Sequence, residues 1–276
     1  MPAPHSPMAT PMPWNLVASG YTSDILPVFE RFASDALRFA EVKPGERILD
    51  VAAGPGTLSL AAERSTVVSA IDFAPGMVEQ LRKRAKAADR TIDARVGDGM
   101  QLPWPDSSFD AAFSMFGLMF FEDRARGFSE LWRILKPGGR AVVSSWTRIE
   151  RTPLLAAFFE ALEAELPHLP FGGSREPLAD EEGYRTEISQ AGFTDVVVRE
   201  VSHGVDIPSA QEFLQSAERS NAPFALLKEK IGPEAFRPLR QSLQKRLEQE
   251  LGTGPLRLEM TALLGRGRRA AQRVDV

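Results

Sequence analysis

Two glycines and an acidic residue follow one another in an order that suits a nucleoside ligand. Gly54 and Gly56 directly follow a short apolar run, and Asp72 ends the next such run along the chain. Glycine lets the backbone approach a ligand closely, and the free N–H groups that open the following helix favour an anionic group. A carboxylate about 20 residues beyond such a turn is placed to accept hydrogen bonds from both hydroxyls of a ribose. The spacing therefore predicts the sugar end of a nucleoside site.

Asp98 extends this interpretation to the base of the nucleoside. It ends a third apolar run and is followed by Gly99 and Met100. We expect its carboxylate to accept a hydrogen bond from an adenine amino group, while the backbone of the next two residues meets the ring edge. Each acid taken alone has another explanation, because aspartate caps helices and an Asp-Gly pair is typical of turns. The order of all these residues along the chain favours a nucleoside pocket.

The elements that must position these residues have the pattern of an open α/β sheet. Between residues 47 and 146, short apolar or β-branched runs alternate with amphipathic helical stretches, which is typical of parallel strands with helices on both faces. Ligands of such sheets bind at the carboxyl ends of the strands. The runs predicted as strands are residues 47–53, 66–72, 93–98, 109–116, 141–146, 194–201 and 256–264.

Four longer segments match a known pattern of motifs. They are RILDVAAGPGTLSL, VSAIDFAPGMVEQLRKRA, VGDGMQLPWPDSSFDAAFS and ELWRILKPGGRAVVSSW. Together they resemble the class I S-adenosylmethionine-dependent methyltransferases, in particular the small-molecule branch related to the ubiquinone and menaquinone C-methyltransferases. The resemblance covers residues 14–148 well and agrees more weakly with the rest. It implies a methyltransferase that binds S-adenosyl-L-methionine and releases S-adenosyl-L-homocysteine.

The resemblance also implies where each part of the cofactor lies. The residues around the methionine part would be Asp50, Ala52, Gly54 and Gly56, with Asp72 at the ribose, Phe73 and Met77 against the adenine, Asp98, Gly99 and Met100 at the adenine edge, and Met115 behind the sulfonium. The segment that holds Tyr21 resembles the helix that caps the cofactor in this family. Ala52 departs from the pattern, which often has glycine there, and we expect its methyl group to be tolerated if its φ is negative.

Aromatic and sulfur-bearing side chains after the fourth strand are candidates for the acceptor pocket. Phe116, Met119, Phe120 and Phe121 stand where the family keeps this pocket, and Trp146 ends the fifth strand. The alternative is that part of this apolar set belongs to the core. Further apolar lining is expected from LLAAFF, PFGG and the helices of residues 205–252.

His203 is the candidate general base. In-line displacement from a sulfonium mainly needs the acceptor atom about 3 to 3.5 Å from the methyl carbon, so geometry would supply most of the catalysis. A hydroxyl or carbon acid must still lose a proton, and His203 follows the sixth predicted strand. A histidine at the surface or in side-chain packing is the alternative interpretation.

The fold class expected is a doubly wound, Rossmann-like and mostly parallel seven-stranded sheet. Helical segments in residues 205–252 predict a helical lid inserted before the last strand. The expected division is 1–13 for a disordered tail, 14–44 for N-terminal capping helices, 45–148 for the cofactor-binding core, 149–204 for core completion and a substrate-side helix, 205–252 for the lid and 253–276 for the last strand and tail.

Composition excludes several classes of protein. The chain has no cysteine, so thiolate nucleophiles, disulfides and thiolate zinc sites are ruled out, and its three scattered histidines make a metal site unexpected. A net charge of -4 provides no general attraction for nucleic acid. The longest apolar run is too short to span a bilayer, and we expect a cytoplasmic protein that acts on a small molecule. A homodimer is left open.

Three other functions are alternatives to methyl transfer to a small acceptor. A nicotinamide-dependent oxidoreductase also has a glycine turn followed by an acid, but GPGTLS lacks the third glycine of that fingerprint. A non-catalytic adenosylmethionine-binding regulatory protein would have the same cofactor residues. RNA methylation is disfavoured because SMFG, rather than a base-methylating signature, follows the fourth strand.

Overall fold

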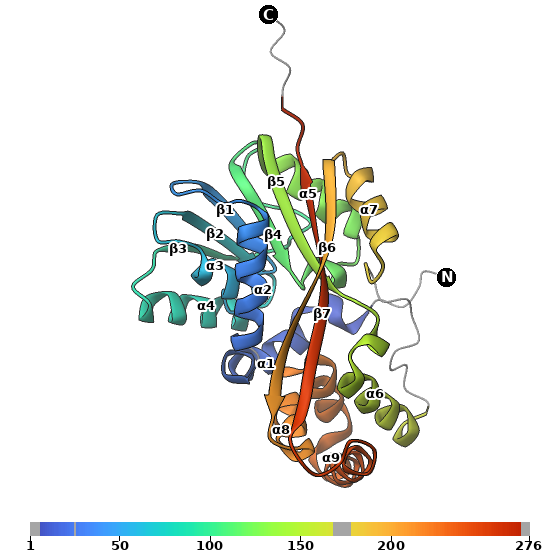
Figure 1. The fold of residues 1–276 in the computed structure, drawn as a ribbon. Coiled ribbons are helices and arrows are strands. Elements are labelled where there is room, and N and C mark those ends of the chain that lie inside the picture. The colour runs from blue at the N-terminus through green and yellow to red at the C-terminus, as the bar shows by residue number, and fades with distance from the viewer. Residues whose placement is uncertain (1–5, 25, 168–177, 272–276) are drawn as a thin grey trace, which may run out of the picture.

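A computed structural model describes residues 6–24, 26–167 and 178–271, and its centre is a seven-stranded sheet (Figure 1). The strands are β1 (Arg47–Val51), β2 (Val67–Asp72), β3 (Ile92–Val96), β4 (Phe109–Met115), β5 (Leu135–Trp146), β6 (Thr194–Ile207) and β7 (Leu256–Arg268). Their order is β3-β2-β1-β4-β5-β7-β6, and only β7 runs antiparallel to its neighbours. The predicted mostly parallel sheet is confirmed.

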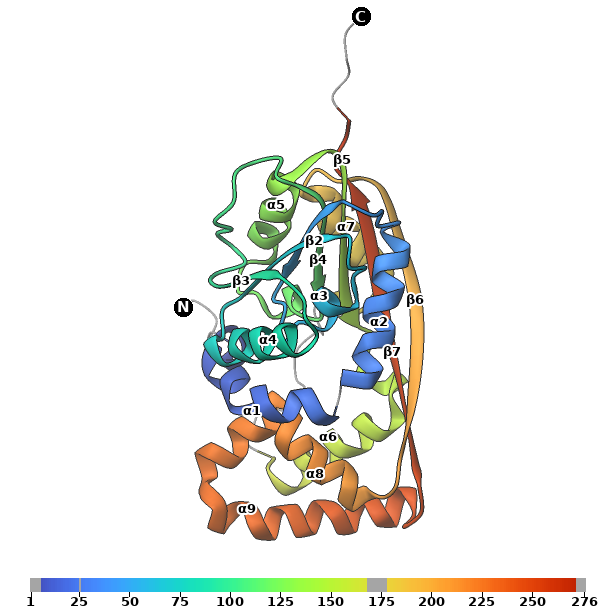
Figure 2. The ribbon, with the colours of Figure 1, turned by 90° about the vertical axis from the view of Figure 1, so that its left-hand side faces the viewer.

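Helices cover both faces of the sheet, as the alternating pattern predicts. On one face lie α2 (Leu26–Phe39), α3 (Thr57–Ala61) and α4 (Pro75–Ala87). On the other face lie α5 (Arg124–Ile134) and α7 (Glu181–Gln190), which bury Phe128, Tyr184 and their neighbours against β1, β4 and β5. The two layers are seen edge-on in Figure 2. Loops that follow β1, β2, β3 and β4 therefore meet at one end of the sheet.

The insertion before the last strand is helical, as predicted, and has a core of its own. β6 and β7 continue past the sheet as a long hairpin, with α8 (Ala210–Ser220) and α9 (Ala222–Leu251) between them (Figures 1 and 2). These helices pack with α6 (Pro153–Glu165) around Phe158, Phe213 and Leu243. Gly232, at φ 77°, breaks the helical path of α9. Within the described part of the chain, no helix is both long enough and apolar enough to cross a lipid bilayer.

The N-terminal region is more ordered than the sequence suggests. The expected tail extends to residue 13, but a 3-10 turn, η1 (Pro7–Ala9), is followed by α1 (Pro11–Asp24). Proline is tolerated in the first turn of a helix because the N–H that it lacks has no partner there. Met8 is buried, and its carbonyl accepts a hydrogen bond from the Trp14 indole at 2.9 Å. Residues 1–5 of the predicted tail lie outside the described part.

Three strands are longer than their apolar runs. β5 begins at Leu135, directly after α5, although the KPGG segment predicts a break before residue 141. Leu135 pairs with Phe109, and the register shifts before Ala111 pairs with Arg140. β6 and β7 also extend each other, because each supplies the other with backbone partners beyond the sheet. Pairing between distant segments therefore sets the ends of these strands.

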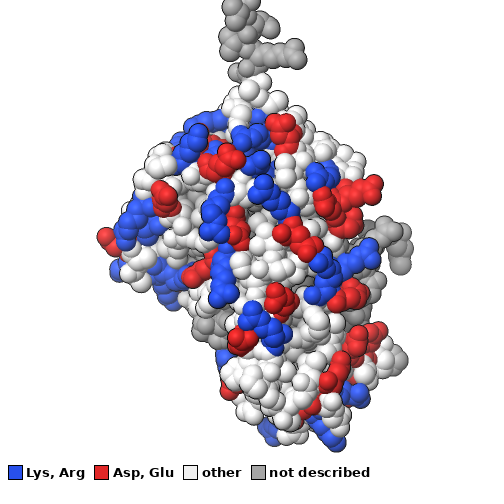
Figure 3. Space-filling model, viewed as in Figure 1, with Lys and Arg blue, Asp and Glu red and all other residues white. Residues whose placement is uncertain are grey.

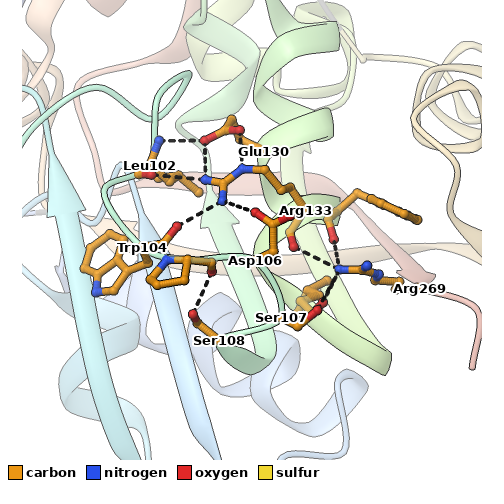
Figure 4. A network of polar contacts seen from close by, with 11 residues as sticks. Leu102, Trp104, Asp106, Ser107, Ser108, Glu130, Arg133 and Arg269 are labelled. Carbon is orange, nitrogen blue, oxygen red and sulfur yellow. Dashed lines mark hydrogen bonds and ion pairs between the residues drawn. The ribbon is translucent and has the colours of Figure 1, made fainter. Parts of the chain in front are cut away.

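Arg133 and Arg269 form a network of polar contacts at the end of the sheet opposite the loops that follow β1 to β4 (Figure 4). Arg133, at the end of α5, forms ion pairs with Glu130 and Asp106 at 2.7 Å. Arg269, just after β7, donates to the carbonyls of Arg133 and Leu135 at 2.9 and 2.6 Å and lies over the Trp132 ring. These contacts join the C-terminal end of α5 to the last strand.

On the face that carries α2, β6 and β7, basic and acidic side chains are interspersed (Figure 3). Ion pairs there include Arg266 with Glu41 and Arg151 with Glu200. This face therefore has no continuous surface of one sign.

Candidate active site

A cavity opens at the carboxyl ends of the parallel strands and holds most of the residues predicted for the cofactor. Its volume is about 1010 Å³, a value that includes open solvent at its mouth. The predicted cofactor residues that line it are Tyr21, Asp50, Ala52, Gly54, Asp72, Phe73, Met77, Asp98, Gly99, Met100 and Met115. The structure thus brings together loops from four strands and one N-terminal helix.

Asp50 lies near the end of β1 and is almost fully buried, with 1% of its surface exposed. Its Oδ2 accepts hydrogen bonds from the Ser59 N–H at 3.1 Å and the Ser59 hydroxyl at 2.7 Å. Burial raises the pKa of Asp50 to about 7, and the nearby charge of Asp72 acts in the same direction. No basic side chain of the described residues is among the groups that shift its pKa, so its ionised form is buried without a basic partner there.

Asp72 ends β2 and lies close to the first turn. Its Oδ2 accepts from the Gly54 N–H at 2.8 Å, and its Oδ1 accepts from the Ala74 N–H at 2.9 Å. Burial raises its pKa to about 6, although both backbone hydrogen bonds oppose this effect. Asp72 therefore fixes the β1 turn from the next strand and still lines the cavity, where each oxygen can accept a further hydrogen bond.

The turn after β1 has an unusual backbone at a residue other than glycine. Ala52 adopts φ 55°, so the condition on which its methyl group was expected to be tolerated is not met. Gly54 and Gly56 also have positive φ, at 54° and 80°. A left-handed alanine is strained by roughly 1 to 2 kcal/mol, which the surrounding contacts must offset.

Gly56 is not among the residues that line the cavity. A Cβ on this residue would lie 2.6 Å from Cγ of Leu81, so the glycine allows α3 to pack closely on α4. A glycine in such a turn can contact a ligand or allow close packing, and the sequence does not reveal which helix packs against it. The sequence therefore predicts a ligand contact as readily as a packing role. The structure gives it a packing role instead.

The end of the cavity near β3 matches the site predicted for the adenine edge. Asp98 is exposed, and its Oδ1 accepts from the Met100 N–H at 2.8 Å, so it also makes the turn that its Asp-Gly pair suggests. Gly99 is buried under Phe121, and a Cβ there would lie 2.5 Å from Cζ of that ring. Phe73, from the loop after β2, lines the same cavity. Apolar surfaces and one acidic oxygen therefore face this end.

Helix α1 covers the cavity from above the strand ends. Trp14 and Tyr21 both line it, and Trp14 packs edge-on against Phe120 with ring centroids 5.1 Å apart. Burial raises the pKa of Tyr21 well above its ordinary value, and the charge of Asp72 adds to this. The tyrosine hydroxyl therefore stays protonated and can donate a hydrogen bond at neutral pH.

The predicted acceptor residues are only partly in the cavity. Phe116 and Phe120 line it, whereas Met119 is buried beside it in η2 (Leu118–Phe120). Trp146 lies behind Phe116, stacked on it at 3.8 Å with the rings 15° from parallel. Adjacent residues of a 3-10 turn point in different directions, so Met119 and Phe120 cannot both face the ligand. Residues 170–173, expected to line the pocket, lie outside the described part.

His203 does not reach the cavity. Because β6 continues to Ile207, His203 lies within the strand, paired with Met260, rather than at a strand end. Its Nε2 lies 2.6 Å from Oδ2 of Asp35 on α2, and its ring packs edge-on against Phe32. The prediction of a base at the reacting centre is therefore not supported by its placement, and the alternative of a packing histidine fits.

The cavity also has lining residues that the sequence analysis did not single out. They are Ala9, Phe29, Ala33, Pro55, Thr57, Leu58, Ile71, Gly97, Gly117 and Glu122. Phe29 comes from α2, which is amphipathic, so its apolar face was visible in the sequence but its direction toward the strand ends was not. Only the packing of α2 across β1 and β4 brings Phe29 to Phe116, with ring centroids 5.1 Å apart.

Comparison with known proteins decides the family. A family model described as a methyltransferase domain matches residues 49–143. The demethylmenaquinone methyltransferase of Paenarthrobacter aurescens strain TC1 is 32% identical over 219 residues, which are 74% of this chain and 83% of that enzyme. This chain belongs to the class I S-adenosylmethionine-dependent methyltransferases related to the quinone methyltransferases. The methyltransferase from Corynebacterium glutamicum with the same name is 33% identical over 183 residues, 60% of this chain and 75% of the relative.

Solved structures share the fold of this methyltransferase. The YcgJ protein from Bacillus subtilis aligns with a TM-score of 0.58 and 18% identity, covering 88% of this chain and 100% of its own. Phosphoethanolamine N-methyltransferase 2 from Haemonchus contortus, in complex with phosphomonomethylethanolamine and S-adenosylhomocysteine, aligns with a TM-score of 0.50 and 20% identity over 86% of this chain and 51% of its own. These likenesses support the α/β fold with its mostly parallel sheet.

Proposed function

We propose that this methyltransferase binds S-adenosylmethionine in the cavity beneath α1 and transfers its methyl group to a small, partly apolar acceptor. The observation that supports the donor site most strongly is the pair of buried carboxylates, Asp50 and Asp72. Among the described residues, no basic side chain lowers the pKa of either acid. A buried carboxylate without a counter-charge is unfavourable, and a cationic ligand would remove this penalty. The donor carries both an ammonium and a sulfonium group.

The residues around the cavity divide the work of holding such a ligand. Asp50 has one oxygen engaged by Ser59, so its other oxygen is available to an ammonium group. Asp72 and Asp98 both line the cavity, and in this proposal Asp72 accepts from the ribose hydroxyls and Asp98 from the adenine amino group. Phe73 and Met77 supply apolar surface for the base, and Tyr21 can donate from the roof of the cavity. These assignments follow the order of the strands in the sheet.

The acceptor would meet a different kind of surface. S-adenosylmethionine supplies a methyl group on a positively charged sulfur, which leaves as a neutral thioether. Phe29, Phe116 and Phe120 form an apolar wall that excludes water and holds a partly apolar molecule in place. Positioning of this kind can lower a barrier by up to roughly 7 to 11 kcal/mol. The relatives are named for demethylmenaquinone, so this quinone is the first acceptor to test.

Donor binding is tested by calorimetric titration with S-adenosylmethionine, S-adenosylhomocysteine and NAD. We expect the first two to bind and NAD to give no response. Asp72→Asn should weaken both by at least about tenfold, or about 1.4 kcal/mol. The matched control is Asp93→Asn, which changes an exposed acid on β3 that pairs with Arg95. Tight NAD binding without a response to the other two ligands would refute the proposal.

Methyl transfer is tested with a methyl-labelled donor. Demethylmenaquinone is supplied in oxidised and reduced forms, next to a panel of small phenols, enols and amines. We expect label in an apolar acceptor and none in highly charged amines, because the acceptor wall has aromatic surfaces. Donor binding with no labelled product across the panel would instead indicate a protein that binds the donor without transferring its methyl group.

A further inference from the structure

Strand β4 ends beside the apolar wall proposed for the acceptor, and the turn that follows it is strained, like the turn after β1. Phe116 directly follows β4 and adopts φ 56°, which a phenylalanine rarely does. The paired residues of β4 and β5 end with Met115 and Ser144, and the next amide, that of Phe116, donates to Oγ of Ser144 at 2.8 Å. Ser144 is fully buried. A side-chain hydroxyl thus takes the place of the missing backbone partner.

Other contacts hold the same ring in one orientation. Trp146 stacks on Phe116, and Phe29 and Phe32 pack edge-on against it with centroids 5.1 and 5.3 Å away. Side chains alternate across a strand, so Ser144 and Trp146 project from the same face of β5. Together they fix the backbone and the ring of Phe116 from one neighbouring strand.

The acceptor-side turn is also packed against the donor-side turn. A Cβ on Gly117 would lie 2.3 Å from Cβ of Ala52, the strained residue at the end of β1. The two left-handed residues, Ala52 and Phe116, both line the cavity. Any relaxation of Phe116 would therefore shift a wall that faces both ligands.

We propose that Ser144 is a positioning residue for methyl transfer, acting through Phe116. Its hydroxyl satisfies the Phe116 amide and so holds the peptide bond from which the strained Phe116 carries its ring into the cavity wall. Without the hydroxyl the amide is left buried and unpaired, so this peptide gains by turning toward another partner, and that movement lets Phe116 relax from its strained φ. This role rests on the proposed function, because Phe116 matters only if an acceptor is held at this wall.

The neighbouring residue provides a matched control. Ser145 is also fully buried, but it projects from the opposite face of β5, and its Oγ donates to the Leu178 carbonyl at 2.6 Å. Ser145→Ala removes a buried hydroxyl and one hydrogen bond, as Ser144→Ala does. The two variants differ in whether the lost bond holds Phe116.

The experiment compares Ser144→Ala, Ser145→Ala, Phe116→Leu and the Ser144→Ala/Phe116→Leu double variant. S-adenosylhomocysteine titration counts the competent sites and gives donor affinity. The kcat and acceptor KM are measured with demethylmenaquinone, or with the acceptor that the labelled-methyl panel identifies. We expect Ser144→Ala to lower kcat per competent site about tenfold and to leave the donor Kd within about twofold. Ser145→Ala should leave both unchanged, and Ser144→Ala should have no further effect once Phe116 is leucine.

The outcomes separate this inference from the proposed function. Equal kcat for the Ser144→Ala and Ser145→Ala enzymes, or additive effects in the double variant, would overturn the positioning role while leaving methyl transfer intact. A wild-type protein that binds no S-adenosylhomocysteine, or that methylates no acceptor of the panel, would overturn the proposed function and this inference with it.

Discussion

Asp50 and Asp72 combine deep burial with hydrogen bonds that only partly support their charges. Asp50 relies on Ser59, and Asp72 relies on the Gly54 and Ala74 amides. Desolvation outweighs these bonds and raises both pKa values, to about 7 and about 6. Near neutral pH each of these two acids is therefore protonated in part of the ligand-free molecules. A cation in the cavity would shift both toward the ionised form.

The raised pKa of Asp50 predicts a stability that falls as pH rises. Between about pH 4 and 7 the folded protein keeps a proton that the unfolded chain releases, so the free energy of unfolding decreases across this window. Asp50→Asn should remove this contribution, on the order of a few kcal/mol. Urea unfolding of the wild type and of Asp50→Asn, from about pH 4.5 to about pH 8, measures the difference in unfolding free energy.

Ligand affinity should follow pH in the opposite direction. Under the proposed function the ammonium group of S-adenosylhomocysteine pairs with the ionised acid, so its affinity should rise up to about pH 7 and then level off. Asp50→Asn should bind more weakly and without this rise. Equal pH slopes of stability and of affinity in the two proteins would show that Asp50 does not titrate in this range.

Gly117 and Ala52 should be coupled energetically because Gly117 packs directly against the methyl group of Ala52. Gly117→Ala would place a Cβ 2.3 Å from the Ala52 Cβ, and we expect a loss of roughly 1 to 3 kcal/mol. In an Ala52→Gly background the same substitution should lose much less, since the opposing methyl group is absent. A double-mutant cycle of unfolding free energies measures this coupling. Ala52→Gly alone should be neutral or slightly stabilising, because glycine adopts φ 55° without strain.

At the scale of elements, the strands and the glycine turn were readable from the sequence because each is encoded locally. Short apolar runs located all seven strands, and the acids at their ends located the cavity. The direction of a packed side chain was not encoded in this way. Gly56 serves the packing of α4, and His203 lies in mid-strand because β7 extends β6. Phe29 enters the cavity only through the position of α2 over the sheet.

The contacts that Arg269 makes at the C-terminal end of α5 should stabilise the fold without affecting the cavity. Arg269 donates to the carbonyl of Arg133 in the last turn of α5 (Figure 4) and to the carbonyl of Leu135 in β5. Its guanidinium carbon lies 4.1 Å from the centroid of the Trp132 ring. Arg269→Ala leaves these carbonyls with fewer donors, and we expect a loss of roughly 1 to 3 kcal/mol. Arg268→Ala is the control, since the ion pair of its side chain with Glu41 is long, at 3.9 Å, and its loss should lower stability by less than about 1 kcal/mol.

Chemical denaturation of the two arginine variants measures these losses, and S-adenosylhomocysteine titration should give the wild-type affinity for both. A weakened affinity in Arg269→Ala would mean that the far end of the sheet does influence the strand-end loops.

At the scale of the whole molecule, two apolar cores are joined by the hairpin of β6 and β7 and by α1. One core surrounds the sheet, and the other lies among α6, α8 and α9. A smaller cluster includes Val17 of α1, Met77 of α4 and Ala222 of α9. Helix α1 thus lies between the sheet and the helical insertion, as Figure 2 shows, and its Trp14 and Tyr21 line the cavity. Its position is set by both parts of the molecule.

The contact between α1 and the insertion should therefore affect ligand binding at a distance. Gly20 packs so closely on α8 that a Cβ would lie 2.2 Å from the Arg219 carbonyl oxygen. Gly20→Ala favours helix formation by propensity alone, so any loss must come from displacement of α1. Because α1 carries Trp14 and Tyr21 into the cavity, we expect the Kd for S-adenosylhomocysteine to rise about tenfold, equivalent to about 1.4 kcal/mol. Ser19→Ala, on the exposed side of the same helix, should bind as the wild type does. Calorimetric titration of the three proteins decides the matter, and an unchanged Kd in Gly20→Ala would show that the cavity holds its ligand independently of the insertion.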